Sequence, residues 1–130
     1  MKTVKVAAAV IRKDSLIYAV QRGYGEYKDG WEFPGGKIEQ GETAEEALVR
    51  EIHEELNMTV QPVTYLDTIE MDYRTFHLSM QCYLCEIEEG EPVPSEAEDT
   101  RWLDYDHLYS VDWLPADLAL IPLLQNILKQ

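Results

Sequence analysis

Residues 36–58 read GKIEQGETAEEALVREIHEELNM, and seven residues of this stretch are glutamate. Three of them, Glu51, Glu54 and Glu55, are spaced i, i+3 and i+4, so a helix would place their carboxylates on one face. Like charges this close repel each other and weaken a helix unless something neutralises them. Hard divalent cations such as Mg²⁺ prefer carboxylate oxygens. The spacing therefore predicts either a metal-binding helix face or a solvated acidic surface.

The residues around these glutamates predict where the helix begins and ends. Thr43 and Glu46 form a capping-box pattern, in which each side chain accepts a hydrogen bond from the other residue's backbone N–H. Asn57 stands where a left-handed residue ends a helix, a conformation that Asn tolerates. The apolar positions between these ends repeat at helical spacing, which predicts a face packed on the core: Ala44, Ala47, Leu48, Ile52 and Leu56.

An aromatic and glycine-rich segment over 31–37, WEFPGGK, comes just before this helix. Adjacent glycines allow backbone conformations closed to other residues, and they let a main-chain carbonyl or N–H approach a ligand closely. This flank favours the metal-binding interpretation of the acidic helix over the solvated surface.

Gly36, Glu42 and residues 50–58 follow the pattern G-x5-E-x7-R-E-U-x-E-E-x-G-U, where U is an aliphatic residue. The chain therefore resembles the Nudix hydrolases, and the segment over 31–37 is typical of their MutT-like branch. Asn57 departs from the pattern because it stands where the family has Gly, and Met58 fits the aliphatic position loosely. The resemblance extends over most of the chain.

The rest of the chain predicts an α/β protein. Alternating or β-branched segments predict strands over 3–12, 16–21, 63–72, 76–87 and 101–103. Between them we expect a glycine-containing loop over 23–30, an acidic loop over 88–100 and a helical turn over 105–109. A last helix is expected over 118–128, with Pro122 in its first turn or at a kink. Helices on both faces of mixed strands make an α/β/α sandwich with a mixed β-sheet, which is also the Nudix fold, in one domain over 1–130.

The composition limits the kinds of partner that the chain can bind. A net charge of −14 excludes binding to a nucleic acid polymer or an anionic membrane through a basic surface. No segment reaches the roughly 18 apolar residues that a membrane-spanning helix needs, and the start of the chain does not read as a signal peptide. We therefore expect a cytoplasmic protein, and a monomer or weak dimer. A phosphorylated substrate would have to bring a metal ion and meet local cations.

The resemblance implies that the chain hydrolyses a nucleoside triphosphate to a monophosphate and pyrophosphate, with Mg²⁺ as cofactor and Mn²⁺ able to substitute. It implies that Arg50 orients the glutamates and that Glu42 lies next to the site. The implied catalytic residues are Arg50, Glu51, Glu54 and Glu96. The implied metal ligands are Glu51, Glu54, Glu55, Glu96 and the Gly35 carbonyl. Glu98 is the alternative to Glu96, and either Glu51 or the loop glutamate acts as the base.

Four further residues are candidates for substrate binding, each with a structural alternative. Arg22 and Lys37 could offset phosphate charge, or be exposed surface charges. Phe33 could stack on a nucleobase, or belong to the core. Asp117, in a Pro-Ala-Asp form that resembles the CTP pyrophosphohydrolase subgroup, could accept from the amino group of cytosine, or cap the last helix. Oxidised guanine remains an alternative base of the substrate.

Two other functions remain as alternatives. One is hydrolysis of a nucleoside diphosphate derivative, such as a nucleotide sugar or a dinucleotide. The other is a non-catalytic nucleotide-binding regulatory domain, which the full set of glutamates disfavours. Cys82 and Cys85 have a C-x-x-C spacing, but their surroundings predict a strand, in which residues three apart point to opposite faces. We therefore expect inert thiols there and neither a metal nor a redox site.

Overall fold

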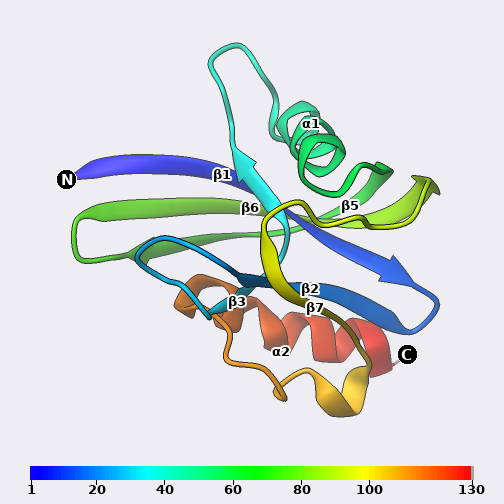
Figure 1. Ribbon diagram of the computed structural model, residues 1–130. Coiled ribbons are helices and arrows are strands. Elements are labelled where there is room, and N and C mark those ends of the chain that lie inside the picture. Colours follow the sequence, from blue (N-terminus) through cyan, green and yellow to red (C-terminus); the bar gives the residue numbers. More distant parts are fainter. Residues whose placement is uncertain (130) are drawn as a thin grey trace.

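The computed structural model describes residues 1–129 and consists of one mixed sheet with a helix on each face (Figure 1). The strands are ordered β3-β2-β1-β6-β5, with β4 paired to β1 and β7 paired to β2. Strand β1 (Lys2–Lys13) runs parallel to β6 (Phe76–Glu89) and antiparallel to β2 (Leu16–Arg22). The predicted mixed β-sheet is therefore confirmed.

The remaining elements connect these central strands. They are β3 (Trp31–Glu32), β4 (Gly35–Lys37), α1 (Ala44–Leu56), β5 (Thr59–Asp72), β7 (Ala97–Leu103), the 3₁₀ turn η1 (Tyr105–His107) and α2 (Pro115–Lys129). In the described chain, residues 1–129, no helix is long and apolar enough to cross a membrane.

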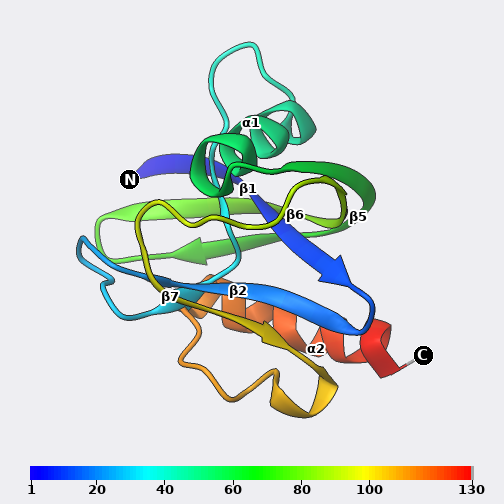
Figure 2. The same cartoon turned by 45° about the vertical axis from the view of Figure 1, so that its right-hand side comes forward.

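Alternate residues of β1 serve two different cores, because successive side chains of a strand point to opposite faces. Ala8 and Val10 pack with α2, whereas Ala9 and Ile11 pack with α1. The two helices lie on opposite sides of the sheet in both views (Figures 1 and 2), which confirms the α/β/α sandwich. The cysteines of β6 divide in the same way: Cys82 belongs to the α2 core and Cys85 to the α1 core.

Both cysteine thiols are free and buried, as expected. Burial raises the pKa of Cys85 to about 12 and raises that of Cys82 as well, so neither is a ready thiolate at neutral pH.

Helix α1 has the predicted boundaries. The Thr43 hydroxyl accepts from the Glu46 N–H at 3.1 Å, and the Glu46 carboxylate accepts from the Thr43 N–H at 2.9 Å. At the other end Asn57 adopts φ 53° and ψ 41°, the left-handed conformation expected of a helix cap. The predicted apolar face, with Leu48 and Ile52 at its centre, is buried.

The predicted start of the last helix was wrong. Helix α2 begins at Pro115, where proline suits a first helical position because its missing N–H has no partner there in any case. Pro122 consequently lies in the interior of the helix and not in its first turn. Asp117 lies inside the first turn, so the alternative that it is the N-cap is also wrong.

The predicted acidic loop over 88–100 was too long. Strand β6 continues to Glu89, which pairs with Thr59, and β7 already begins at Ala97. Strand β5 likewise begins at Thr59 and not at Val63. Cross-strand pairing outweighs the low strand propensity of these glutamates. The loop is therefore confined to residues 90–96.

Candidate active site

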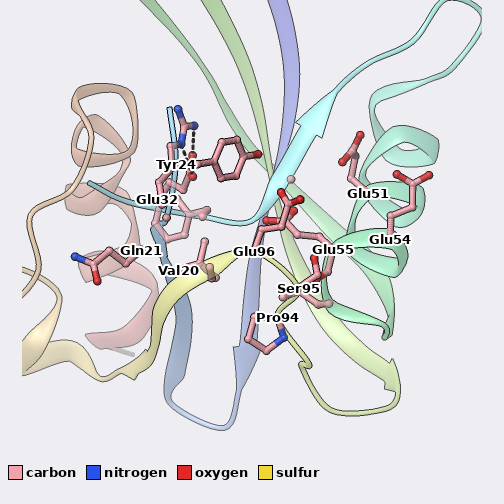
Figure 3. Close-up of a pocket in the computed structure, with 16 residues that line it drawn as sticks. Val20, Gln21, Tyr24, Glu32, Glu51, Glu54, Glu55, Pro94, Ser95 and Glu96 are labelled. Atoms are coloured by element: carbon pink, nitrogen blue, oxygen red, sulfur yellow. Dashed lines mark hydrogen bonds and ion pairs between the residues drawn. The ribbon is translucent and has the colours of Figure 1, made fainter. Parts of the chain in front are cut away.

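A cleft of about 360 Å³ opens between α1, β2 and the loop over 90–96. Figure 3 shows the α1 side chains on one side of it, Glu96 from the loop in the middle, and Glu32 and Tyr24 opposite. The carboxylates that line it are Glu32, Glu51, Glu54, Glu55 and Glu96. Arg22 is the one basic residue that lines the cleft in the described chain. The cleft is therefore strongly negative and suited to cations.

Arg50 holds the acidic cluster in place. Its guanidinium forms a bidentate pair with Glu42, with Nε to Oε2 at 2.7 Å and Nη2 to Oε1 at 2.9 Å. The Nη1 group donates to Glu51 at 2.9 Å and reaches Glu54 at 3.5 Å. The guanidinium lowers the pKa of Glu42 to about 2, so this carboxylate stays ionised at neutral pH. Glu51 is thus held in one orientation by a planar, permanently charged group.

The glycine pair lets the backbone of β4 approach both the sheet and α1. A Cβ at Gly36 would lie 2.3 Å from the Cδ of Glu51, so a side chain there would collide with the carboxylate. A Cβ at Gly35 would collide with the carbonyl oxygen of Ala7 in β1. Gly35 also lines the cleft. The two glycines therefore place main chain where any other residue would have a side chain.

Glu55 is the carboxylate most affected by its neighbours. Burial, together with the charges of Glu32, Glu51 and Glu96, raises its pKa to about 7, while a backbone hydrogen bond from Gly35 opposes the shift. The ionised form is thus destabilised by desolvation and by like charge. A cation placed among these carboxylates would relieve both.

The residues present fit a divalent cation by the chemistry of their donors, because carboxylate and carbonyl oxygens are the ligands that hard cations take. Within residues 1–129, no three acidic, histidine or cysteine side chains already converge on one point as a preformed metal site. Arg50 instead contacts Glu51 and Glu54, at 2.9 and 3.5 Å. The donor set is in place, and the carboxylates would have to turn toward the ion.

The structure distinguishes the two loop candidates. Glu96 lines the cleft, whereas Glu98 lies in β7 and pairs with Lys28 at 3.4 Å outside it. The loop over 90–96 is tied to the end of α1 by the Val93 N–H, which donates to the Leu56 carbonyl at 2.8 Å, and by the Ser95 N–H, which donates to the Glu55 carbonyl at 3.2 Å. The backbone that carries Glu96 is thus anchored beside Glu55.

The two candidate cations occupy different places. Arg22 lines the cleft, where its guanidinium forms a bidentate pair with Glu32, at 2.9 and 2.6 Å. Lys37 does not line the cleft and its residue is exposed, although its backbone carbonyl accepts from Arg50 at 3.1 Å. Of these two candidates, only Arg22 lies at the cleft, and its guanidinium is already paired.

Phe33 and Asp117 are joined by a hydrogen bond at the border of the cleft, which only Phe33 of the two lines. The Phe33 ring stacks on Trp113 with centroids 4.6 Å apart and is only 4% exposed, yet the residue lines the cleft. The buried Asp117 carboxylate accepts from the Phe33 N–H at 3.0 Å, but Asp117 does not line the cleft. Burial raises the pKa of Asp117 to about 8. Phe33 is thus a core residue that also borders the site, with a buried acid behind it.

Glu32 and Tyr24 line the cleft and were not among the sequence candidates. Glu32 lies within the WEFPGGK segment, and its acidity next to the glycine pair was a usable signal. Tyr24 belongs to the glycine-containing loop over 23–30 and is 62% exposed, although it lines the cleft. The sequence alone gave no reason to prefer Tyr24 over the neighbouring Tyr27.

The NUDIX domain family matches residues 1–124. The chain is 33% identical over 129 residues to the 8-oxo-dGTP diphosphatase of Escherichia coli K12, covering 98% of this chain and 100% of that protein. It is 29% identical over 122 residues to the CTP pyrophosphohydrolase of the same organism, covering 93% and 90%. The solved MutT NUDIX hydrolase from Burkholderia pseudomallei has a TM-score of 0.81 at 25% identity, covering 98% and 99%. The similarity thus extends well beyond the glutamate-rich helix.

Proposed function

Because this chain belongs to the NUDIX domain family and is a Nudix hydrolase, we propose that it is a Mg²⁺-dependent nucleoside triphosphate pyrophosphohydrolase. The proposed products are a nucleoside monophosphate and pyrophosphate. The observation that carries the proposal is the gathering of five carboxylates in one cleft, in which the single basic side chain among the described lining residues is already paired. Such a cleft would repel a bare triphosphate and accept one that arrives with a divalent cation.

The proposed roles follow from the positions of the side chains. Glu51, Glu54, Glu55, Glu96 and the Gly35 carbonyl would hold the cation. When bound, Mg²⁺ would offset the charge that grows on the phosphate oxygens in the transition state, and Mn²⁺ could substitute. Arg50 would keep Glu51 oriented throughout. One carboxylate, Glu51 or Glu96, would take the proton of the attacking water.

The proposed substrate is either a cytidine or deoxycytidine triphosphate or an oxidised purine triphosphate. Two of the relatives that match nearly the whole chain are named for one class each. Phe33 lines the cleft, and Asp117 lies behind it on the Phe33 N–H, so these two residues would shape the base-binding end. Protonated Asp117 could donate as well as accept a hydrogen bond, which suits either base.

A product assay tests the proposal. We expect pyrophosphate, and not orthophosphate, from one base class in a panel of canonical and oxidised nucleoside triphosphates, and only with Mg²⁺. Glu54→Gln is the matched blank, because Glu54 is 60% exposed and its replacement should leave the fold intact. Turnover that persists in Glu54→Gln would contradict the proposal. The absence of turnover by the parent protein with every triphosphate would contradict it as well. The proposal also includes a cytoplasmic location and a monomeric or weakly dimeric state. Light scattering measures the oligomeric state.

A further inference from the structure

The end of β2 lies against the backbone of Glu96. Arg22, the last residue of β2, pairs with Ala97 at the start of β7. The next residue, Gly23, approaches so closely that a Cβ there would lie 2.7 Å from the Glu96 carbonyl oxygen. Tyr24 follows directly, so its side chain leaves the backbone beside Glu96.

The loop between β2 and β3 is closed at its base and tied to β7. The Arg22 N–H donates to the Gly30 carbonyl at 2.9 Å, and the Asp29 N–H donates to the Arg22 carbonyl at 2.8 Å. The Lys28 ammonium pairs with Glu98 of β7 at 3.4 Å. These contacts fix the loop relative to the strand that follows the catalytic candidate of the acidic loop.

The Tyr24 hydroxyl and the Glu96 carboxylate face each other in the cleft. Both residues line the cleft, and the hydroxyl end of Tyr24 points toward Glu96 (Figure 3). Partial burial, the charge of Glu96 and a hydrogen bond to its side chain raise the pKa of the Tyr24 phenol. A hydrogen bond that raises the pKa of a phenol is one that the phenol donates, because it favours the protonated form. The phenol is therefore a neutral donor to this carboxylate at neutral pH.

Glu96 has no cationic partner to hold it. It forms no ion pair within residues 1–129, and Arg22, the one basic residue that lines the cleft in this described part, is paired with Glu32. On its other side Glu96 meets the like charge of Glu55, whose pKa it helps to raise. A neutral phenol can fix one carboxylate oxygen without cancelling the charge, and the second oxygen then stays available to a cation or a water molecule.

We propose that Tyr24 is a positioning residue, whose hydroxyl holds the Glu96 carboxylate turned toward the glutamates of α1. This inference rests on the proposed function, in which Glu96 is a metal ligand or the base. Tyr24 would do for Glu96 what Arg50 does for Glu51, from the opposite side of the cleft. Because the phenol is neutral, it would orient Glu96 and leave its full charge for the metal-bound substrate.

Tyrosine ring resonances test the contact without metal or substrate. In protein isotope-labelled at the tyrosine rings, the signal of Tyr24 is identified by its absence from Tyr24→Phe. We expect Glu96→Gln to shift this signal, because an ionised carboxylate accepts a stronger hydrogen bond than an amide. Glu98→Gln is the matched control and should leave the signal in place, because Glu98 pairs with Lys28 outside the cleft. A Tyr24 signal that is unchanged in Glu96→Gln, or that moves equally in Glu98→Gln, would overturn the proposal.

Steady-state kinetics separate a positioning role from a substrate contact. Tyr24→Phe keeps the ring and loses the hydroxyl, so we expect kcat to fall by at least about fivefold with little change in KM. Tyr27→Phe is the same change in the same loop, at a residue that does not line the cleft, and should keep kcat within about twofold of the parent value. In the Glu96→Gln background Tyr24→Phe should cost little more, because the carboxylate that it positions is already gone.

The kinetic results also separate a failure of this inference from a failure of the proposed function. If the parent protein turns over a triphosphate, a raised KM with unchanged kcat in Tyr24→Phe, or a full additional loss in the double variant, would overturn the positioning role alone. If the parent protein turns over no triphosphate, the proposed function fails and the positioning role fails with it, whatever the chemical shifts show.

Discussion

The carboxylate of Glu51 occupies the space that a side chain at Gly36 would need, since a Cβ there would lie 2.3 Å from its Cδ. We predict that Gly36→Ala displaces this carboxylate and lowers kcat by about 10- to 100-fold, because small misplacements at a reacting centre are costly. The φ of Gly36 is not positive, so alanine adds no backbone strain. Steady-state kinetics with Mg²⁺ measures the loss, and circular dichroism checks the fold.

A double-mutant cycle with Glu51→Gln provides the control for this prediction. If Gly36→Ala acts through Glu51, the double variant should be little worse than Glu51→Gln alone. Additive losses would show that the added methyl acts elsewhere.

Arg50→Lys should lower kcat by at least about tenfold, although it keeps the charge. Lysine is a point charge and cannot reproduce the bidentate pair with Glu42 while also contacting Glu51. Arg101→Lys on β7, outside the cleft, is the matched control and should retain activity. Full activity of Arg50→Lys would mean that charge alone suffices to organise the glutamates.

Glu96→Gln and Glu98→Gln should differ although only one residue separates them. Glu96 lines the cleft, whereas Glu98 pairs with Lys28 at 3.4 Å outside it. We expect Glu96→Gln to lower kcat by about 100-fold or more, the loss expected when a general base is removed. Glu98→Gln should stay within about twofold of the parent protein. The reverse order would transfer the catalytic assignment to Glu98.

Asn57→Gly should stabilise the protein. Asn57 has φ 53° and ψ 41°, a region that glycine enters without the Cβ penalty paid by other residues. We expect a net gain on the order of 0.5 kcal/mol in the free energy of unfolding, measured by urea denaturation, because relief of the left-handed Cβ penalty outweighs the extra freedom that glycine gives the unfolded chain. Asn57→Ala, with a Cβ and no amide, should instead lose stability, and a gain from alanine would contradict the explanation.

Asp117→Asn should remove part of the pH dependence of stability. Burial raises the folded-state pKa of Asp117 from 3.8 to about 8, so between these values the folded state binds more protons than the unfolded state. The stability of the parent protein should therefore fall as pH rises from about 4 to about 8, and then level off. Asparagine does not ionise, and its amide oxygen can still accept from the Phe33 N–H.

Urea denaturation from about pH 5 to about pH 9 measures this effect. The variant should gain on the parent as pH rises, by an amount on the order of 1–3 kcal/mol across the series. The raised pKa values of Glu55 and His77 act in the same direction in both proteins and cancel in the difference. Parallel curves would show that Asp117 ionises inside the folded protein at little cost.

The sequence predicted α1 well because its signals are local. The Thr43 cap, the apolar face and Asn57 all act within a few residues, and each has its expected place. The start of α2 was wrong because proline at a first helical position looks like a helix break when it is read alone. Residues 88–100 were assigned to a loop because acidic strands are recognised only by their partners, here Thr59 for Glu89.

For the site residues, too, local spacing could be read from the sequence, whereas contacts made through the sheet could not. The spacing of Glu51, Glu54 and Glu55 could be read directly, because a helix repeats regularly. Lys37 was named for its charge, and the fold leaves it outside the cleft. Glu32 was missed as a partner of Arg22 because the pair depends on the contact between β2 and β3, which brings residues ten apart together. Side chains that meet through the sheet are not visible in local sequence patterns.

The approach of Gly35 to Ala7 has a consequence for how this protein can be mapped by mutation. A Cβ at Gly35 would collide with the Ala7 carbonyl oxygen. The strand that supplies the proposed carbonyl ligand can therefore lie this close to β1 only because Gly35 has no side chain. Mutagenesis that shortens side chains tests only atoms that a residue already has. It would find no effect at Gly35, which has no side chain to shorten. The informative experiment adds a single methyl group at Gly35. It would show that this glycine is the position beside the cleft that tolerates substitution least.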